Sequence, residues 1–312
     1  MPEGSDERKE AGERSGTARK ITFYLPGMFH YHGLKGKYPG VSVTGSRCTL
    51  QCDHCRAGLL KGMIAAEDPR SLLEVCIRLK ARGHHGVLLS GGSDRQGRIP
   101  WKPFLPAIEK IKSETGLYIS VHSGLVDDET ARGLKAAGVD QALIDVVGDD
   151  ETYRRVCHVP FGVDRIRASM EAMRRADLAL APHIVCGLDG GKMGSEERAV
   201  RMIATVGAEQ VVVVSLMPSP GTPFHRVSTP SAEEVARIIS CARELMPDVR
   251  ISLGCARKRG DTAMELSAID AGVDRMALPS EEAVAHARRR GLRISYQRTC
   301  CSVSLDLSRD AW

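Results

Sequence analysis

Residues 70–90 read RSLLEVCIRLKARGHHGVLLS, an amphipathic helical pattern followed at once by a short β-rich run. Apolar residues recur every three or four positions through residues 70–82, whereas residues 86–90 form a compact apolar run of strand length. Parallel strands need long crossovers, which are usually helices, so a helix leading into a buried strand is the repeating unit of a parallel sheet. The stretch therefore predicts an α/β fold.

The same alternation extends in both directions along the chain. Eight β-rich runs are recognisable, at residues 41–45, 86–90, 117–121, 141–146, 179–186, 210–216, 249–254 and 273–278. Further amphipathic segments occupy residues 162–175, 195–206 and 231–245. Ser195, Thr229 and Ser280 are candidate helix caps. Eight strands with helical crossovers predict a single (βα)8 barrel of the TIM type, in which functional residues follow the carboxyl ends of the strands.

The two ends of the chain differ from the predicted barrel, which occupies residues 41–290. Residues 1–20 are charged and nearly free of large apolar side chains, so they are expected to be disordered. Residues 21–40 mix aromatic residues with glycines and are expected to form an irregular lead-in packed on the barrel. Residues 291–312 form an extension beyond the eighth unit and contain two adjacent cysteines.

The composition is that of a globular protein. The 312 residues are 42% hydrophobic and 27% charged, and no apolar run approaches the roughly 20 residues that a membrane helix needs. Aromatic residues make up only 4%, too few for a base-stacking platform, so neither nucleic acid nor a membrane is an expected partner. No secretory signal is recognisable, and a cytoplasmic location is expected. There, clustered cysteines more often bind metals or act in catalysis than form disulfides.

Three of the ten cysteines follow the first predicted strand at the spacing C-x3-C-x2-C. One compact loop can thus direct the thiolates of Cys48, Cys52 and Cys55 toward a common centre. Three thiolates hold three irons of a [4Fe-4S] cluster and leave the fourth iron open, whereas a closed zinc site needs a fourth Cys or His. His54 could supply that ligand only awkwardly, because it adjoins Cys55. A zinc site or a chance grouping stays open as the alternative.

This motif resembles the signature of the radical S-adenosylmethionine (SAM) enzymes. In that family SAM chelates the open iron through its amino and carboxylate groups, and an electron from the cluster cleaves it to methionine and a 5′-deoxyadenosyl radical. The resemblance implies a [4Fe-4S] cluster on Cys48, Cys52 and Cys55, with SAM beside it. It also implies a low-potential electron donor such as ferredoxin or flavodoxin.

Three further segments resemble the SAM-binding parts of the family, although each is also compatible with an ordinary βα turn. Residues 90–93 (SGGS) resemble the glycine motif that binds the methionine amine, with Ser93 where a Glu is common. Asp145 stands at the position of a ribose-hydroxyl ligand, and residues 184–188 (IVCGL) resemble the segment behind the adenine. No catalytic residue is assigned. The implied cofactor-binding residues are His54, Ser90, Gly91, Gly92, Ser93, His122, Ser123, Asp145 and Gly187.

Within the family the chain most resembles biotin synthase, over nearly the whole barrel. Residues 220–224 (PGTPF) resemble its Gly-Thr-Pro segment. Residues 249–255 (VRISLGC) resemble its seventh strand, whose last position is an arginine that ligates a second, sulfur-donating cluster; Cys255 stands there in this chain. The cysteines that complete that cluster are replaced by Gly91 or Gly92, His122 or Ser123, and Pro182 or His183. Biotin synthesis itself is therefore not expected.

Cys300 and Cys301 in the extension offer alternative ligands. Together with Cys255 they could hold an auxiliary iron–sulfur cluster, expected to be [4Fe-4S], at the barrel mouth, or they could simply pack the extension on the barrel. Of the other cysteines, Cys76 and Cys241 are expected in helix cores. Cys157 and Cys186 are expected near the active face, and their roles stay undecided.

This combination resembles one subunit of the two-protein, archaeal-type lipoyl synthase. Such a radical SAM sulfurtransferase inserts sulfur into an octanoyl chain on a carrier-protein lysine, with the auxiliary cluster as sulfur donor. The resemblance implies two partners, a second homologous radical SAM subunit and an octanoylated lipoyl-carrier protein or peptide. Two alternatives stay open. One is another biotin-synthase-like radical SAM enzyme acting on a small molecule, and the other is a non-enzyme, either an iron–sulfur electron carrier or a zinc-stabilised barrel.

Overall fold

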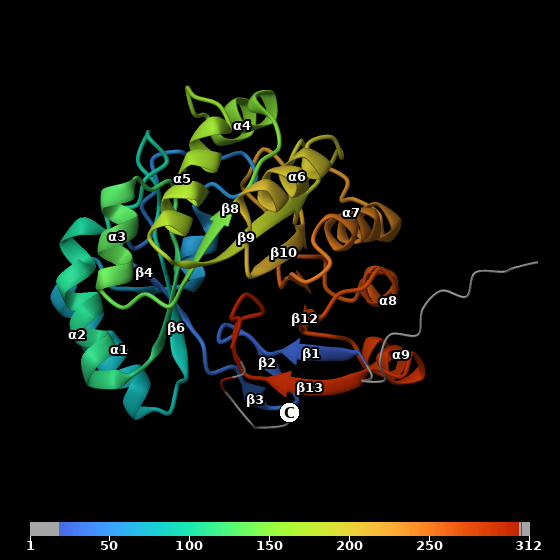
Figure 1. The fold of residues 1–312 in the computed structure, drawn as a ribbon, viewed down its shortest axis with the longest axis horizontal. Coiled ribbons are helices and arrows are strands. Elements are labelled where there is room, and N and C mark those ends of the chain that lie inside the picture. The colour runs from blue at the N-terminus through green and yellow to red at the C-terminus, as the bar shows by residue number, and fades with distance from the viewer. Residues whose placement is uncertain (1–18, 306, 308–312) are drawn as a thin grey trace, which may run out of the picture.

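The computed structural model describes residues 19–305 and 307, in which one parallel sheet of eleven strands curls into an incomplete barrel (Figure 1). The sheet order is β13-β1-β12-β11-β10-β9-β8-β7-β6-β4-β5. Its strands are β1 (Lys20–Tyr24), β4 (Gly40–Ser42), β5 (Ile64–Ala65), β6 (Gly86–Ser90), β7 (Tyr118–His122), β8 (Gln141–Asp145), β9 (Ala179–Cys186), β10 (Gln210–Ser215), β11 (Arg250–Leu253), β12 (Arg275–Ala277) and β13 (Arg293–Gln297).

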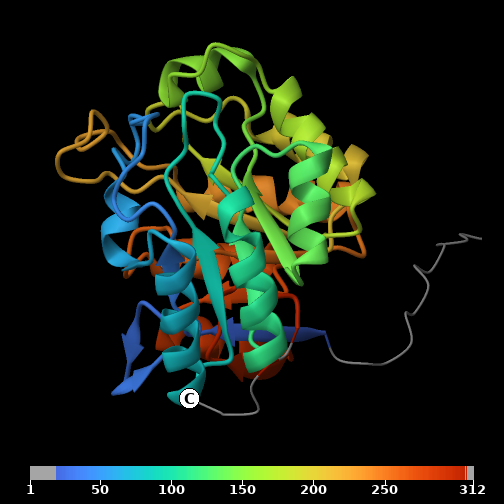
Figure 2. The ribbon, with the colours of Figure 1, turned by 90° about the vertical axis from the view of Figure 1, so that its left-hand side faces the viewer.

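Helices cover the outer face of this sheet, and one further helix, which follows β8, lies beyond the carboxyl ends of the strands (Figures 1 and 2). They are α1 (Pro69–Ala81), α2 (Leu105–Thr115), α3 (Asp128–Ala136), α4 (Asp150–Cys157), α5 (Asp164–Arg175), α6 (Glu196–Val206), α7 (Ala232–Leu245), α8 (Thr262–Asp270) and α9 (Glu281–Arg289), with 3-10 turns η1 (Gly58–Gly62) and η2 (Lys102–Phe104). A separate antiparallel hairpin joins β2 (His30–Tyr31) and β3 (Leu34–Lys35). Within the described part of the chain, no helix has the length and apolar character required to span a membrane.

The predicted α/β fold with a parallel sheet is confirmed, but the closed (βα)8 barrel is not. All eight predicted strands are present and lie side by side in chain order from β4 to β12. The sheet does not close between these two strands. Instead β5 adds to β4 at one edge, and β1 and β13 add to β12 at the other.

The extra strands come from the segments on either side of the predicted barrel. Residues 21–40 were expected to be irregular, yet β1 lies between β12 and β13. The cause is the alternating pattern of β1. Ile21 and Phe23 belong to the core beneath the helices, whereas Thr22 and Tyr24 lie on the opposite face of the sheet. The expected disordered tail lies outside the described residues, apart from its last two residues.

Helix starts correct two of the three predicted caps. Ser280 caps α9 as predicted, its side chain accepting a hydrogen bond from the helix. The cap of α7 is Ser231 rather than Thr229, because the Ser231 hydroxyl accepts from the Glu234 N–H while the Glu234 carboxylate accepts from the Ser231 N–H. Ser195 makes no side-chain cap bond, since its backbone is already helical.

The two faces of the sheet differ in chemistry. Val211 and Val213 of β10 belong to the main core, which lies between the sheet and the helices. The barrel interior carries buried polar side chains, among them Gln210 and Arg275. After β13 the chain turns into this interior (Figure 1). The barrel is therefore filled in part by the C-terminal extension.

Candidate active site

The cysteine loop follows β4, and its three thiols line one cavity of about 250 Å³. The Sγ of Cys52 lies 3.9 Å from the carbonyl oxygen of Cys157. A hydrogen bond to Cys157 and burial raise the pKa of Cys52, and a hydrogen bond to Cys52 together with burial raises that of Cys55 to about 12. Metal binding at these positions must therefore displace protons.

The three thiols of the loop border one cavity without converging on a single point. Among residues 19–305 and 307, no three Cys, His, Asp or Glu side chains converge on one ion-sized point. A [4Fe-4S] cluster instead takes each thiolate on a different iron, so Cys48, Cys52 and Cys55 need only surround a common cavity.

The glycine segment after β6 lies directly against the cysteine loop. The N–H of Gly92 donates to Oγ1 of Thr44 over 2.6 Å, and the carbonyl of Ser93 accepts from the N–H of Thr49 over 2.8 Å. A Cβ atom on Gly92 would lie 2.5 Å from the Cα and Cβ of Cys48. These polar groups and the missing side chain thus serve to hold the cysteine loop close to the sheet.

Replacing Gly92 by alanine is expected to displace the cysteine loop, because the new Cβ would also lie 1.9 Å from the carbonyl oxygen of Arg47. A displacement near 1 Å can cost about a hundredfold in rate, so a similar fall in 5′-deoxyadenosine formation is expected. The matched control is Gly58→Ala in the neighbouring turn, where a Cβ meets nothing within 4 Å. Iron content and product are measured for both; equal activity in the two variants would contradict the prediction.

Three titratable side chains from β7, β8 and β9 meet beside the cysteine loop. Nε2 of His122 lies 3.5 Å from Oδ1 of Asp145, and the rings of His122 and His183 are 5.6 Å apart. The Asp145 side chain is 55% exposed, because it faces the cavity. Both His122 and Asp145 line that cavity, as the resemblance implies for SAM contacts.

The charges in this group are set by mutual contact. Burial favours the neutral acid, but the neighbouring His122 holds the pKa of Asp145 well below its usual range. Burial works against the His122 cation, and Asp145 outweighs it, so the pKa of His122 is raised. Burial and His122 lower the pKa of His183 to about 4. At neutral pH the cavity is therefore lined by an ionised Asp145, and a neutral His183 lies beside His122.

The remaining implied SAM contacts divide into two groups. His54 and residues 90–93 line the cavity. Ser123 and Gly187 do not: the buried Ser123 hydroxyl donates to the Leu143 carbonyl, and the Gly187 N–H donates to the Glu196 carboxylate. Both residues bind neighbouring structure because they lie just past the strand end, behind the residues that face the cavity.

Apolar residues of the cavity were not predicted from the sequence. Leu59, Leu60, Met63 and Tyr153 are among the residues that line it. The 3-10 turn η1 brings the first two into place, and a turn of this length has no periodic pattern to reveal it. Leu59 is an exposed large hydrophobic residue, 56% accessible.

A second group of thiols forms where β11 and the extension meet. Cys301 is 2% exposed, and its thiol is hydrogen-bonded to both Cys255 and Cys300. These bonds lower the pKa of Cys255, lower that of Cys300 to about 6 and raise that of Cys301. The Ser302 hydroxyl donates to Sγ of Cys300 over 3.1 Å. The structure thus brings together three cysteines that are up to 46 residues apart in the sequence (255 to 301).

A buried ion pair stands behind this second group. Arg257 is 1% exposed, lies 2.6 Å from Glu265 and donates to the carbonyl of Gly254. It also donates to the carbonyl of Ala277, so it ties the loop after β11 to the end of β12. The position of Cys255 is therefore fixed on one side by the sheet.

His122 interacts with members of both groups of cysteines. It lines the first cavity, and it interacts electrostatically with both Asp145 and Cys300.

The other cysteines are placed as follows. Cys76 and Cys186 are fully buried in the main core, Cys241 packs against that core, and Cys157 lines the first cavity. Cys76 therefore lies in the core, as expected. Of the two cysteines whose roles were undecided, only Cys157 is close to the cysteine loop.

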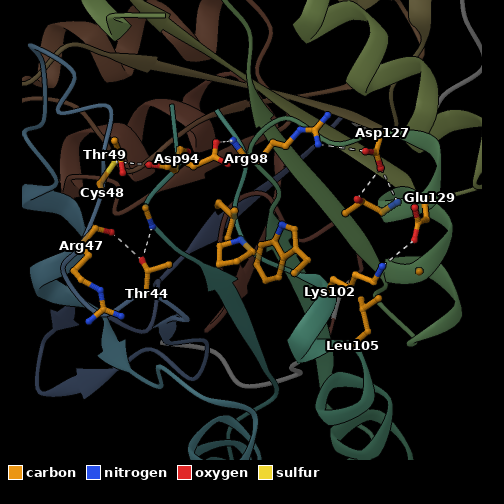
Figure 3. Close-up of a pocket in the computed structure, with 17 residues that line it drawn as sticks. Thr44, Arg47, Cys48, Thr49, Asp94, Arg98, Lys102, Leu105, Asp127 and Glu129 are labelled. Atoms are coloured by element: carbon orange, nitrogen blue, oxygen red, sulfur yellow. Dashed lines mark hydrogen bonds and ion pairs between the residues drawn. The ribbon is translucent and has the colours of Figure 1, made fainter. Parts of the chain in front are cut away.

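A larger cavity of about 780 Å³ lies against the other side of the cysteine loop (Figure 3). Its charged side chains are paired, with Arg98 3.6 Å from Asp127 and Lys102 3.4 Å from Glu129. Cys48 lines both cavities, so the loop is the wall between them.

Comparison with known families assigns both halves of the chain. The family described as "Radical SAM superfamily" matches residues 42–204, which contain the cysteine loop and the Asp145 group. The family described as "Biotin and Thiamin Synthesis associated domain" matches residues 211–308, which contain the second thiol group.

Similar proteins are distant in sequence. A biotin synthase from Leptospira biflexa is 24% identical over 226 residues, which cover 70% of this chain and 62% of that protein. A 3-methylornithine synthase from Methanosarcina barkeri is 26% identical over 247 residues, covering 77% and 67%.

Solved structures share the fold. Methylornithine synthase (PylB) superposes with a TM-score of 0.60 at 20% identity, covering 85% of both chains. HydG, a maturase of the [FeFe]-hydrogenase, gives a TM-score of 0.63 at 15% identity over 89% of this chain and 64% of that one. At these identities the likeness concerns the fold alone.

Proposed function

The chain belongs to the radical SAM superfamily, and from this premise we propose that it is a sulfur-inserting enzyme acting on an octanoyl chain, as one subunit of a two-protein lipoyl synthase. It is a radical SAM enzyme of the biotin-synthase-like type. The observation that carries the finer proposal is the meeting of Cys255, Cys300 and Cys301 beside the SAM cavity.

The residues have separate roles in this proposal. Cys48, Cys52 and Cys55 hold the [4Fe-4S] cluster, and residues 90–93 keep their loop against the sheet. When bound, the cluster and SAM supply a 5′-deoxyadenosyl radical that can take hydrogen from an unactivated carbon. The ionised Asp145, held by His122, offers acceptor oxygens to ligand hydroxyls in the cavity.

Sulfur insertion needs a donor close to the carbon that has lost its hydrogen. Cys255, Cys300 and Cys301 are suited to hold an auxiliary iron–sulfur cluster in that place, because Cys300 interacts electrostatically with His122, which lines the cavity. The lowered pKa of Cys255 and Cys300 favours thiolates, the form in which cysteine binds iron.

The apolar residues of the cavity support an aliphatic substrate. Leu59, Leu60 and Met63 lie at the cavity next to the cysteine loop, and Leu59 is open to solvent. An alkyl chain that packs on an exposed leucine at a cavity rim displaces water from apolar surface, which favours binding.

A small-molecule substrate is the second candidate. The similarity to the 3-methylornithine synthase, which is 26% identical over 77% of this chain, favours this alternative. The apolar residues of the cavity and the second thiol group favour the octanoyl chain, because binding an alkyl chain and transferring sulfur to it would use both.

Incubation of reconstituted protein with SAM, dithionite and an octanoyl-lysine peptide tests the proposal. The expected result is a peptide heavier by one sulfur atom, detected by mass spectrometry, with 5′-deoxyadenosine formed alongside. The reaction is run with and without the second radical SAM subunit, and a peptide with a free lysine is the control. No sulfur gain in either reaction would overturn the lipoyl proposal, whereas peptide-independent 5′-deoxyadenosine formation would leave the radical SAM assignment intact.

A further inference from the structure

The lower half of the barrel carries polar side chains at the starts of its strands. Gln141, Gln210 and Arg275 begin β8, β10 and β12 and are 0%, 0% and 4% exposed. Barrel interiors of this kind are usually filled by branched apolar residues, and buried polar groups need hydrogen-bond partners. These side chains therefore require a polar occupant.

The C-terminal extension supplies that occupant through its main chain. Gln210 donates from Nε2 to the carbonyl of Cys301 over 2.6 Å. Arg275 donates to the carbonyl of Val303 and, over 3.0 Å, to that of Ser304. These contacts reach Cys301, Val303 and Ser304 of one short segment, from two strands that both pair with β11.

Further contacts come from neighbouring strands. Arg250 at the start of β11 donates to the Ser304 carbonyl over 2.8 Å, and the Ser304 N–H donates to Oε1 of Gln141 over 3.2 Å. Tyr118 at the start of β7 also bonds Gln141 and lies 3.3 Å from the Ser304 hydroxyl. Val303 is fully buried against the Tyr118 ring. Five strands thus bind one short segment.

Residues 299–305 make almost no backbone–backbone hydrogen bonds. Within the described chain, the backbone–backbone hydrogen bond of residues 299–305 is the one from Val303 N–H to the Cys300 carbonyl. Its path depends on side chains of the barrel. Those side chains bind mainly carbonyl and N–H groups, which leaves the Cys300 and Cys301 thiols to meet Cys255.

We propose that these inward side chains form an internal binding site for a short peptide segment, occupied by residues 301–304 of the same chain, and that Gln210 and Arg275 are positioning residues for the second thiol group. The peptide site stands without the proposed function; only the use of the three thiols as cluster ligands rests on it.

Thiol labelling of the metal-free, reduced full-length protein tests the peptide site. In Gln210→Met the Cys301 carbonyl loses its partner, and loss of one buried hydrogen bond shifts a local opening equilibrium about tenfold. Labelling at Cys300 and Cys301 tracks this opening and is expected to accelerate about tenfold. Digestion with trypsin after Arg298 and quantification of the labelled peptide by mass spectrometry give the rate.

Two references make the result specific. Cys76 in α1 is fully buried away from the extension, so its labelling rate should stay at the parent value. Gln96→Met makes the same exchange at an exposed turn and should change neither rate. If Gln210→Met does not fold, Arg250→Met removes a contact from the exposed end of the segment and is expected to give a smaller increase. Parent-like labelling in a folded Gln210→Met protein, or in Arg250→Met where that variant replaces it, would overturn the inference.

Iron content of the reconstituted variant separates the two proposals. Faster labelling together with loss of part of the iron supports both the peptide site and the second cluster. Faster labelling with the parent iron content supports the peptide site and counts against the second cluster.

Discussion

Cys52→Ala is expected to reduce cleavage of SAM to background. Cys52 is the most buried thiol of the cysteine loop, placed between Cys55 and the Cys157 carbonyl. Alanine there leaves two thiolates for a cluster that needs three, so about four irons per chain should be lost with it. The measurements are iron and sulfide content after anaerobic reconstitution and 5′-deoxyadenosine formation with dithionite.

Cys241→Ala is the matched control, since this thiol lies on α7 and packs only against the core. It should keep the iron content and the rate of the parent protein. One zinc per chain and no iron in the parent protein would refute the cluster and leave the zinc-stabilised barrel. Retention of SAM cleavage by Cys52→Ala would remove this cysteine from the ligand set.

Joint replacement of Cys255, Cys300 and Cys301 by alanine is expected to give the opposite pattern. About eight irons per chain should fall to about four, because the ligands of one of two clusters are gone. SAM cleavage should persist, because Cys48, Cys52 and Cys55 are unchanged and line a cavity to which the replaced cysteines do not contribute. Sulfur transfer to the octanoyl peptide should disappear.

The activities lost in the triple variant show whether the two groups of cysteines have separate roles. Loss of SAM cleavage as well as sulfur transfer would contradict separate roles, provided that circular dichroism shows a folded protein. If the triple variant is unfolded, Cys301→Ala alone serves, because this thiol bonds both of the others. Four irons in the parent protein would show that no second cluster exists.

The sequence predicts the sheet well where local pattern decides it. Strands β6 and β9 have the predicted bounds, residues 86–90 and 179–186. The edges of the sheet were not predicted, because the partners of β1 lie some 250 residues away (Thr22 pairs with Arg275) and local periodicity holds no information about them.

The candidate site is predictable to the level of the motif. The loop Cys48–Cys55 and the position of Asp145 follow from spacing and resemblance, and the structure places both at one cavity. Ser123 and Gly187 bind neighbouring structure instead of lining the cavity. This outcome depends on which side of its strand end each residue faces, which the sequence does not reveal. The close approach at Gly92 depends on two loops meeting in space, which spacing along the chain does not encode.

The pairing of β1 sets an order on biosynthesis. This strand leaves the ribosome first among the described strands, yet its neighbours β12 and β13 are made last. Domains form as the chain emerges, so the loop with Cys48 can reach its place before the second thiol group has been made. Any metallocentre at Cys255, Cys300 and Cys301 must therefore be assembled later than residue 301 is synthesised, on a barrel whose first site can already exist.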